Sequence, residues 1–204
     1  IGVGLPGYTN PAKGIWMHCL RMGIRQPIHL ASKLETAFGV PAFIDNDVNA
    51  ATIAEQYYGI GRLCKNFIFV HVDEGVAMGV VAGGHLLRGA GNCVGELGHV
   101  TVEPEGELCE CNARGCLENI VALDRILSKT YEKAAQFPNS QLKQVLGSHS
   151  LTINHIYNAA QEGDDLAMEI TNRVIRALGT GLADSLNILN PEHIVLCGRV
   201  CGHE

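Results

Sequence analysis

The sequence has no apolar run of the length that a membrane span requires, because glycine, asparagine, aspartate or arginine interrupts every hydrophobic segment. It also has no excess of basic residues: 21 acidic and 15 basic side chains give a formal net charge of −6. Without a basic face, this segment is not expected to bind the phosphate backbone of a nucleic acid itself. We therefore expect a soluble protein with no membrane contact.

Other familiar features are missing as well. The sequence has no signal peptide, no internal repeat, no low-complexity tract and no flexible linker. It opens at Ile1 within a strand-like run and lacks an initiator methionine, so we expect a fragment truncated at the N-terminus and also at the C-terminus. With 47% hydrophobic residues among 204, the chain is nevertheless long enough to bury a substantial core.

Eight cysteines are present, and three of them fall between Cys109 and Cys116. In a small secreted domain such cysteines would indicate disulfides. A chain of this size without a signal peptide instead favours reduced thiols and a metal, as in cytoplasmic proteins. We therefore expect a cytoplasmic location.

The hydrophobic pattern predicts strands that alternate with helices. Strands are predicted at 1–5, 42–44, 67–72, 76–82 and 194–196, and helices at 30–38, 48–58 and 166–186. The first helix is expected to end at a glycine cap, Gly39. The last helix has an apolar residue at every fourth position from Leu166 to Leu186 and is expected to end at Asn190-Pro191. Residues 6–14 are predicted to form a loop, and Gly83-Gly84 to close an antiparallel hairpin. The order of elements indicates an α/β protein.

One histidine and three cysteines form the most specific pattern. His99, Cys109, Cys111 and Cys116 have the spacing H-x9-C-x-C-x4-C and supply three thiolates and one imidazole, a full tetrahedral set for zinc. The alternative, free or buried cysteines in a loop, fits poorly with the polar residues around them. Because protein side chains fill all four positions, no place is left for an activated water, and we expect a structural zinc.

Four acidic or amide side chains beside turns form a second candidate site. Asn46 and Asp47 lie at a strand-to-helix turn, Glu96 precedes the histidine by three residues, and Glu118 follows the last cysteine by two. A metal that orders the loop would bring the two glutamates together, and such a cluster of acceptors suits sugar hydroxyls. From spacing alone, solvated surface carboxylates are an equal alternative.

Three longer segments carry a family resemblance. They are Ile44-Asp45-Asn46-Asp47-Val48-Asn49-Ala50-Ala51, Gly95-Glu96-Leu97-Gly98-His99 and Cys109-x-Cys111-x3-Gly115-Cys116-Leu117-Glu118. In this order they resemble the signatures of the ROK family (repressor, open reading frame, kinase), and residues 4–7, 83–89 and 186–191 extend the resemblance over nearly the whole chain. Directly after the second cysteine, where the family commonly has glycine, this chain has Asn112. Asparagine is the non-glycine residue that best tolerates a left-handed backbone, so the loop is expected to form.

The resemblance implies an actin-like ATPase, hexokinase-type α/β fold, ribonuclease H-like, with two lobes and a sugar in the cleft between them. It places the change of lobe near Asn46-Asp47. Residues 1–46 would then be an incomplete small N-terminal lobe, and residues 47–204 the large C-terminal lobe with the hairpin and the zinc loop. By motif, the sugar contacts would be Asn46, Asp47, Glu96, His99 and Glu118, and the zinc ligands His99, Cys109, Cys111 and Cys116. His99 would use one ring nitrogen for each role.

The resemblance also indicates where ATP would bind if the chain were a kinase. A ROK kinase would use Asp47 as the catalytic base and backbone loops for the phosphates. Where family kinases have Gly-Thr-Gly-x-Gly, this chain has Asp73-Glu74-Gly75, which places carboxylates where phosphates would approach. A Gly-Gly pair near the C-terminus is replaced by Cys197-Gly198-Arg199, and the Asp-x-Gly-x-Thr phosphate loop would lie upstream of Ile1. We expect no ATP binding, and Asp47 is catalytic only if the chain is a kinase.

The segments around Asn46 and Glu96 resemble those of the N-acetylglucosamine- and glucose-responsive repressors of the family. We therefore expect the sugar-sensing core of a ROK transcriptional repressor, which binds a hexose or amino sugar and assembles as a homodimer or higher oligomer. DNA would be contacted only through an upstream helix-turn-helix absent from this chain. The alternatives are a fragment of an ATP-dependent sugar kinase, of glucokinase or N-acetylglucosamine kinase type, and a zinc-stabilised interaction module without a sugar function.

Overall fold

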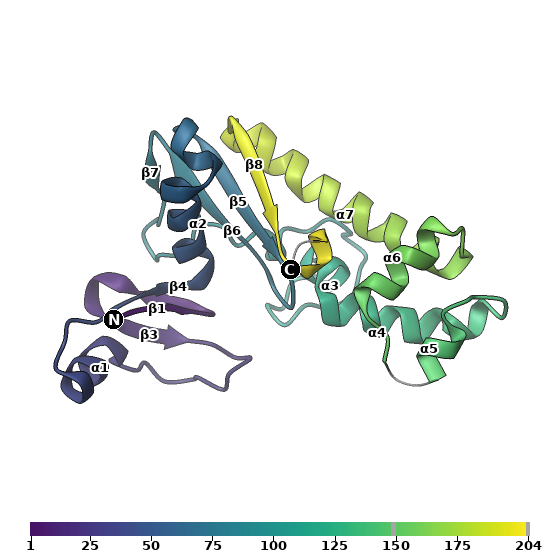
Figure 1. The fold of residues 1–204 in the computed structure, drawn as a ribbon, viewed down its shortest axis with the longest axis horizontal. Coiled ribbons are helices and arrows are strands. Elements are labelled where there is room, and N and C mark those ends of the chain that lie inside the picture. The colour runs from purple at the N-terminus through teal and green to yellow at the C-terminus, as the bar shows by residue number, and fades with distance from the viewer. Residues whose placement is uncertain (148–149, 203–204) are drawn as a thin grey trace. The chain divides into compact units, whose positions relative to one another are not determined.

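The computed structural model describes residues 1–147 and 150–202 (Figure 1). The contacts within the chain divide it into two compact units. The N-terminal unit comprises Ile1–Val70, Met78–Gly95 and Pro191–Val195. The metal-loop unit comprises His71–Ala77, Glu96–Asn190 and the chain from Leu196. The lobe boundary expected between residues 46 and 47 stays a prediction.

The N-terminal unit begins with a parallel strand pair. Strand β1 (Gly2–Leu5) pairs with β4 (Phe43–Asn46), and helix α2 (Asp47–Tyr58), which follows β4 directly, contacts both strands. Helix α1 (Leu30–Phe38) precedes β4 and ends at a left-handed glycine, as predicted. The strand-turn-helix order expected around Asn46 is therefore present.

Residues 6–14 differ from the expected loop. They contain β2 (Tyr8–Asn10), which pairs antiparallel with β3 (Ile15–His18), and the 3-10 turn η1 (Pro11–Lys13) connects the two strands. The indole of Trp16 is buried and donates a hydrogen bond to the carbonyl of Pro6, 2.9 Å away. This hairpin packs on a small core formed by Leu5, Trp16, Cys19, Ala31, Ala42 and Ile44.

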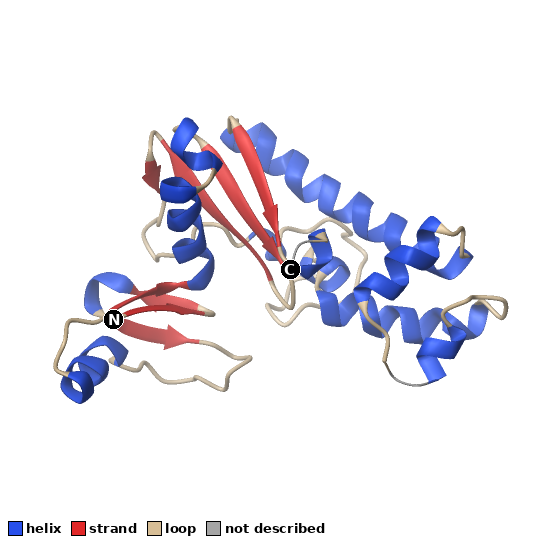
Figure 2. Cartoon of the chain, in the orientation of Figure 1, coloured by secondary structure: helices blue, strands red, loops and turns tan. Residues whose placement is uncertain are grey.

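A four-stranded sheet has the order β7-β6-β5-β8, drawn red in Figure 2. Its strands are β5 (Phe67–Val72), β6 (Val76–Ala82), β7 (His85–Leu86) and β8 (His193–Cys197). Strands β6 and β7 are antiparallel, which confirms the hairpin predicted at Gly83-Gly84. The boundary between the two units falls within β5, β6 and β8, and the short 3-10 helix η2 (Ile60–Leu63) precedes the sheet.

The metal-loop unit is helical apart from the cysteine-rich segment and the ends of β5, β6 and β8 that it contains. Its elements are η3 (Leu97–His99), α3 (Glu118–Val121), α4 (Leu123–Lys133), η4 (Ala134–Gln136), α5 (Lys143–Gly147), α6 (Ile153–Gln161), α7 (Asp165–Leu189) and η5 (Arg199–Cys201). Helices α4, α6 and α7 pack against one another (Figure 1). Ile126, Ile156 and Leu166, one from each helix, are at most 1% exposed and form the centre of this layer.

Helix α7 confirms the long helix predicted from its apolar spacing. Leu166, Ile170 and Val174 of the predicted stripe are buried, but the stripe leaves the buried face in the second half of the helix. A strict spacing of four advances about 40° per step on a helix of 3.6 residues per turn, so such residues cannot all share one face. The C-terminal half instead buries Ala177, Gly181 and Ser185, while Leu186 is 44% exposed. Asn190 adopts a left-handed conformation and ends the helix. None of the helices among the described residues is long and apolar enough to cross a membrane.

Candidate functional site

The structure brings the four predicted metal ligands together. The ligand atoms of His99, Cys109, Cys111 and Cys116 all lie within 4.8 Å of one another. The Sγ atoms of Cys111 and Cys116 are 3.6 Å apart, and Sγ of Cys109 lies 3.7 Å from Nδ1 of His99. A zinc with Zn–S bonds of about 2.3 Å separates neighbouring tetrahedral ligands by about 3.8 Å, so the donor set and its spacing fit zinc. We call these four residues the Cys/His cluster.

The backbone of the cysteine loop, residues 100–117, holds these side chains through a small hairpin. Leu108 and Arg114 form an antiparallel bridge, and the N–H of Cys109 donates to the carbonyl of Ala113 at 2.8 Å. At the tip, Asn112 has a φ of 68°, so the left-handed conformation expected there is confirmed. The tight turn is what allows Cys109 and Cys111 to face the same point.

The thiols of the cluster differ in burial and in the direction of their pKa shifts. Cys116 is fully buried, and burial, followed by the neighbouring thiols, raises the pKa of Cys116 to about 12. The pKa of the exposed Cys111 is lowered, chiefly by a hydrogen bond from the backbone of Ala113. Three thiols this close cannot all ionise without a cation, and a divalent ion would remove that penalty.

The imidazole of His99 has a different neighbour at each ring nitrogen. Nδ1 faces Cys109, and Nε2 lies 3.9 Å from Oε2 of Glu96. The Glu96 side chain is 42% exposed, yet partial burial raises the pKa of its carboxyl; His99 opposes this shift and the Glu118 carboxylate reinforces it. Three of the five predicted sugar contacts are therefore neighbours in the metal-loop unit.

Close backbone packing fixes Glu118. Its Oε2 atom accepts a hydrogen bond from the N–H of Val76 at 2.9 Å. Gly98 allows this approach, because a Cβ at Gly98 would lie 3.2 Å from the same oxygen and would press on the carbonyl of Val76. The lack of a side chain at Gly98 therefore has a steric reason. Because Oε2 of Glu118 is bound to Val76, the orientation of the carboxylate, and with it the position of Oε1, is also fixed.

The other two predicted sugar contacts are adjacent in the N-terminal unit. The Oδ1 atom of Asn46 caps helix α2 by accepting from the N–H of Asn49 at 3.0 Å, and its Nδ2 donates to the carbonyl of Gly7 at 3.1 Å. Both polar atoms of Asn46 therefore already have protein partners. Asp47 is exposed, and among the described residues its Oδ1 accepts a hydrogen bond only from the N–H of Val48, its neighbour in the chain.

The Asp73-Glu74-Gly75 turn is tied to the end of strand β8. Nε of Arg199 lies 3.0 Å from both carboxylate oxygens of Asp73, and its Nη2 is 3.3 Å from Oε1 of Glu74. Hydrogen bonding from Arg199 lowers the pKa of Asp73. The preceding Gly198 has a φ of 107°, and a side chain there would collide with the carbonyl of Val72. The two carboxylates predicted to repel phosphate are thus partly neutralised by Arg199.

Sequence reasoning missed two further ion pairs. Nη1 of Arg88 donates to Oδ1 of Asp45 at 2.9 Å, next to Asn46. Glu103, at the start of the cysteine loop, binds Arg173 on α7. The only available signal was the position of Asp45 and Arg88 inside segments that resemble the family, because neither pair is close in sequence.

A sequence model described as the ROK family matches residues 1–204. The chain belongs to the ROK family. It is 35% identical over 202 residues to a glucokinase of Halalkalibacterium halodurans, covering 98% of this chain and 61% of the relative. It is 34% identical over 200 residues to the DNA-binding transcriptional dual regulator NagC of Escherichia coli, covering 98% of this chain and 48% of the relative.

A solved structure agrees with these sequence matches. The crystal structure of a ROK family transcriptional regulator, a homolog of the Escherichia coli MLC protein, superposes with a TM-score of 0.86 at 30% identity, covering 98% of this chain and 50% of the other. The predicted actin-like, hexokinase-type α/β fold is confirmed. This ROK chain spans about half to two thirds of the length of the curated relatives it matches, and both sugar kinases and repressors are among them.

Proposed function

We propose that this chain is the sugar-sensing core of a ROK transcriptional repressor, and that it binds a hexose or amino sugar beside a structural zinc. The Cys/His cluster would hold the zinc, and Glu96, His99 and Glu118 would contact the sugar, with Asn46 and Asp47 as further predicted contacts. The observation that carries the proposal is the two-sided position of His99, between Cys109 and Glu96.

The chemistry of these side chains suits a polyol. When bound, the zinc would neutralise the thiolates and fix the tautomer of His99, leaving an N–H on Nε2. That N–H donates to a sugar oxygen, while the carboxylates of Glu96 and Glu118 accept from hydroxyl groups. Alternating donors and acceptors around a ring of hydroxyls would give orientation as well as affinity.

The Asp73 turn favours a sensor over a kinase. Two carboxylates and one guanidinium leave an excess negative charge at this turn, and a phosphate would have to take Arg199 away from Asp73. A sensor has no such requirement, because sugar binding needs only the hydroxyl contacts. We therefore propose that ATP does not bind.

A kinase is the second candidate, and one observation favours it. The Asp47 carboxylate is exposed and makes only a local backbone bond, so it is available as a base for a sugar hydroxyl. The relationship to the glucokinase of Halalkalibacterium halodurans is in accord with this role. In that case Asp47 would be catalytic and residues outside this chain would complete the phosphate site.

The regulatory role extends beyond these residues. NagC is a DNA-binding regulator, and we propose that DNA contact here would come through a helix-turn-helix outside residues 1–204. A homodimer, with a small lobe of residues 1–46 and a large lobe of residues 47–204, would respond to sugar by a shift between two states of different affinity.

Calorimetric titration of the metal-loaded chain with glucose, N-acetylglucosamine and magnesium ATP tests the proposal. We expect heat from at least one sugar and none from ATP. Glu118→Gln, which keeps an acceptor for Val76, should weaken sugar binding, whereas Glu105→Gln, an exposed change in the same loop, should not. ATP binding with sugar phosphorylation would establish the kinase, and metal uptake without sugar binding would leave an interaction module.

A further inference from the structure

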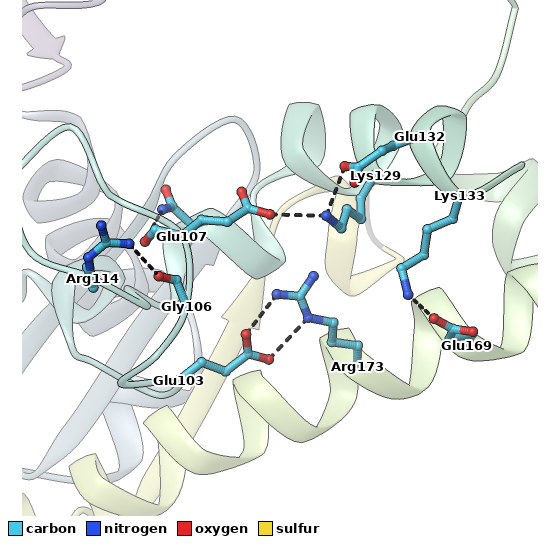
Figure 3. Close-up of polar contacts among 10 residues, drawn as sticks. Glu103, Gly106, Glu107, Arg114, Lys129, Glu132, Lys133, Glu169 and Arg173 are labelled. Atoms are coloured by element: carbon cyan, nitrogen blue, oxygen red, sulfur yellow. Dashed lines mark hydrogen bonds and ion pairs between the residues drawn. The ribbon is translucent and has the colours of Figure 1, made fainter.

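A charged pair attaches the cysteine loop to helix α7 at the loop's first turn. Nε and Nη2 of Arg173 donate to the two carboxylate oxygens of Glu103, at 3.1 and 2.8 Å (Figure 3). Two parallel hydrogen bonds fix the orientation of a carboxylate as well as its position. The Glu103 side chain therefore cannot rotate freely relative to α7.

The backbone of Glu103 is in turn joined to Gly115, the residue that precedes Cys116, which is the most deeply buried of the four predicted metal ligands. The N–H groups of Val102 and Glu103 both donate to the carbonyl of Gly115, at 2.9 and 3.2 Å. Gly115 has a φ of 65°, and a side chain there would collide with the carbonyl of Glu103. Because Gly115 and Cys116 are neighbours in the chain, these contacts couple the position of the Glu103 backbone to that of the Cys116 backbone.

The same helix holds the far side of the loop by apolar contact. A Cβ at Gly181 would lie 2.9 Å from Cδ2 of Leu117 and 3.5 Å from Cδ1 of Leu97, so these leucines pack directly on the helix backbone. Leu117 follows Cys116, and Leu97 lies two residues before His99. Arg173 and Gly181 are eight residues apart, about 12 Å along the axis at 1.5 Å per residue, so α7 supports the loop at two separate points.

We infer that Arg173 is a positioning residue for the metal ligands. Through Glu103 and Gly115, it holds Cys116 in the Cys/His cluster, so the metal meets ligands that are already close to their bound arrangement. This inference rests on the proposed metal centre, and it concerns how tightly that centre retains its ion.

The neighbouring charged pairs differ from this one in ways that provide controls. Lys129 on α4 contacts Glu107 at 3.1 Å but shares its ammonium with Glu132 at 2.8 Å. Lys133 on α4 donates to Glu169 on α7 without touching the loop (Figure 3). Among the ion pairs of the described residues, the Arg173 pair is the one that joins α7 to the turn that contacts Gly115.

The rate of metal transfer to an excess of chelator tests the inference. Arg173→Met and Glu103→Gln should each release zinc up to about fivefold faster, the size expected for a partly exposed ion pair, and Lys133→Met should release it at the wild-type rate. The charge exchange of Glu103→Arg with Arg173→Glu should restore slow release. In cobalt-loaded Arg173→Met, the visible band of the tetrahedral ion should broaden or shift relative to wild type.

Each outcome has one meaning. Faster release with rescue by the exchanged pair supports the positioning role. Equal release rates and identical cobalt spectra in wild type and Arg173→Met would overturn the inference while leaving the metal centre intact. A wild-type chain that takes up neither zinc nor cobalt would overturn the proposed metal centre and this inference together.

Discussion

In the metal-loop unit, the cysteine loop and the layer of α4, α6 and α7 keep their shape through different interactions. The helices meet through side chains such as Ile126, Ile156 and Leu166, which are at most 1% exposed. The loop has little regular structure and is held by the Cys/His cluster, short backbone bonds and charged pairs at its rim. Apolar burial needs neither a metal nor a charge partner, whereas the proposed metal centre and the charged pairs would make the loop sensitive to chelator and to salt.

The difference shows how a site of exact geometry can be built from a segment that lacks a core of its own. The rigid helices have fixed positions, and a few directional contacts from them hold the loop, and so the predicted metal ligands, in place. If this is correct, removing the metal or the charged pairs should loosen the loop and leave the helices folded. Truncating a core side chain should lower the stability of the helices and leave the loop intact for as long as the helices stay folded.

Loss of a metal ligand should have the largest effect. Cys116→Ser removes a fully buried thiol, so bound zinc should fall from the expected one per chain to near zero, because a closed structural site needs all four ligands. Elemental analysis measures the zinc, and amide exchange should show protection lost in residues 100–117 and kept in α4, α6 and α7. Cys64→Ser, outside the cluster, is the control; unchanged zinc in the Cys116 variant would contradict the ligand assignment.

Truncation of the helical core should be next in size. Ile156→Ala should lower the free energy of unfolding by about 2 to 5 kcal/mol, because it opens a cavity at a site that is 0% exposed. The comparison variant Ile175→Ala, at 61% exposure on α7, should change it by no more than about 0.5 kcal/mol. Urea denaturation gives both values. Metal loss in Ile156→Ala under native conditions would argue against separate support of loop and helices.

Acid should weaken the attachment of the loop to helix α7. Hydrogen bonding from Arg173 lowers the pKa of Glu103, so the pair contributes stability above the ordinary glutamate pKa and loses it as pH falls through the lowered value. Carboxyl carbon shifts followed by NMR should show a lower Glu103 midpoint in wild type than in Arg173→Met. Identical midpoints would show that the pair does not form in solution.

The smallest effect is expected where the loop and the helix touch. Gly181→Ala gains helix propensity but pushes on the ends of Leu117 and Leu97, so the free energy of unfolding should change by less than about 1 kcal/mol. Methyl NMR shifts of both leucines should nevertheless move. Unperturbed leucine methyls would mean that the contact shown at Gly181 is absent.

Local patterns explain what the sequence could predict. The zinc pattern lies within eighteen residues, and Asn112 signals its own left-handed turn, so the Cys/His cluster could be foreseen. Continuous apolar residues predicted strand β5 with its observed ends, and Gly39 and Asn190 marked the ends of helices. Each of these signals depends on residues that are close in the chain.

Contacts between distant segments could not be predicted in the same way. Glu103 and Arg173 are 70 residues apart, and Asp73 and Arg199 are 126 apart, so no periodic pattern links the partners. The β2–β3 hairpin was missed because Thr9 and Trp16 are buried by tertiary packing within a segment rich in turn residues. The capping role of Asn46 likewise depends on folded geometry, since it also binds the Gly7 carbonyl.

Sugar binding before and after removal of the metal tests the central claim most directly. The zinc-loaded chain should bind glucose or N-acetylglucosamine in a calorimetric titration, and a chelator-treated sample should lose that binding and recover it when zinc is restored. Such a result would show that the Cys/His cluster organises Glu96, His99 and Glu118. Equal sugar affinity with and without zinc would contradict the account, because the metal would then have no part in forming the sugar site.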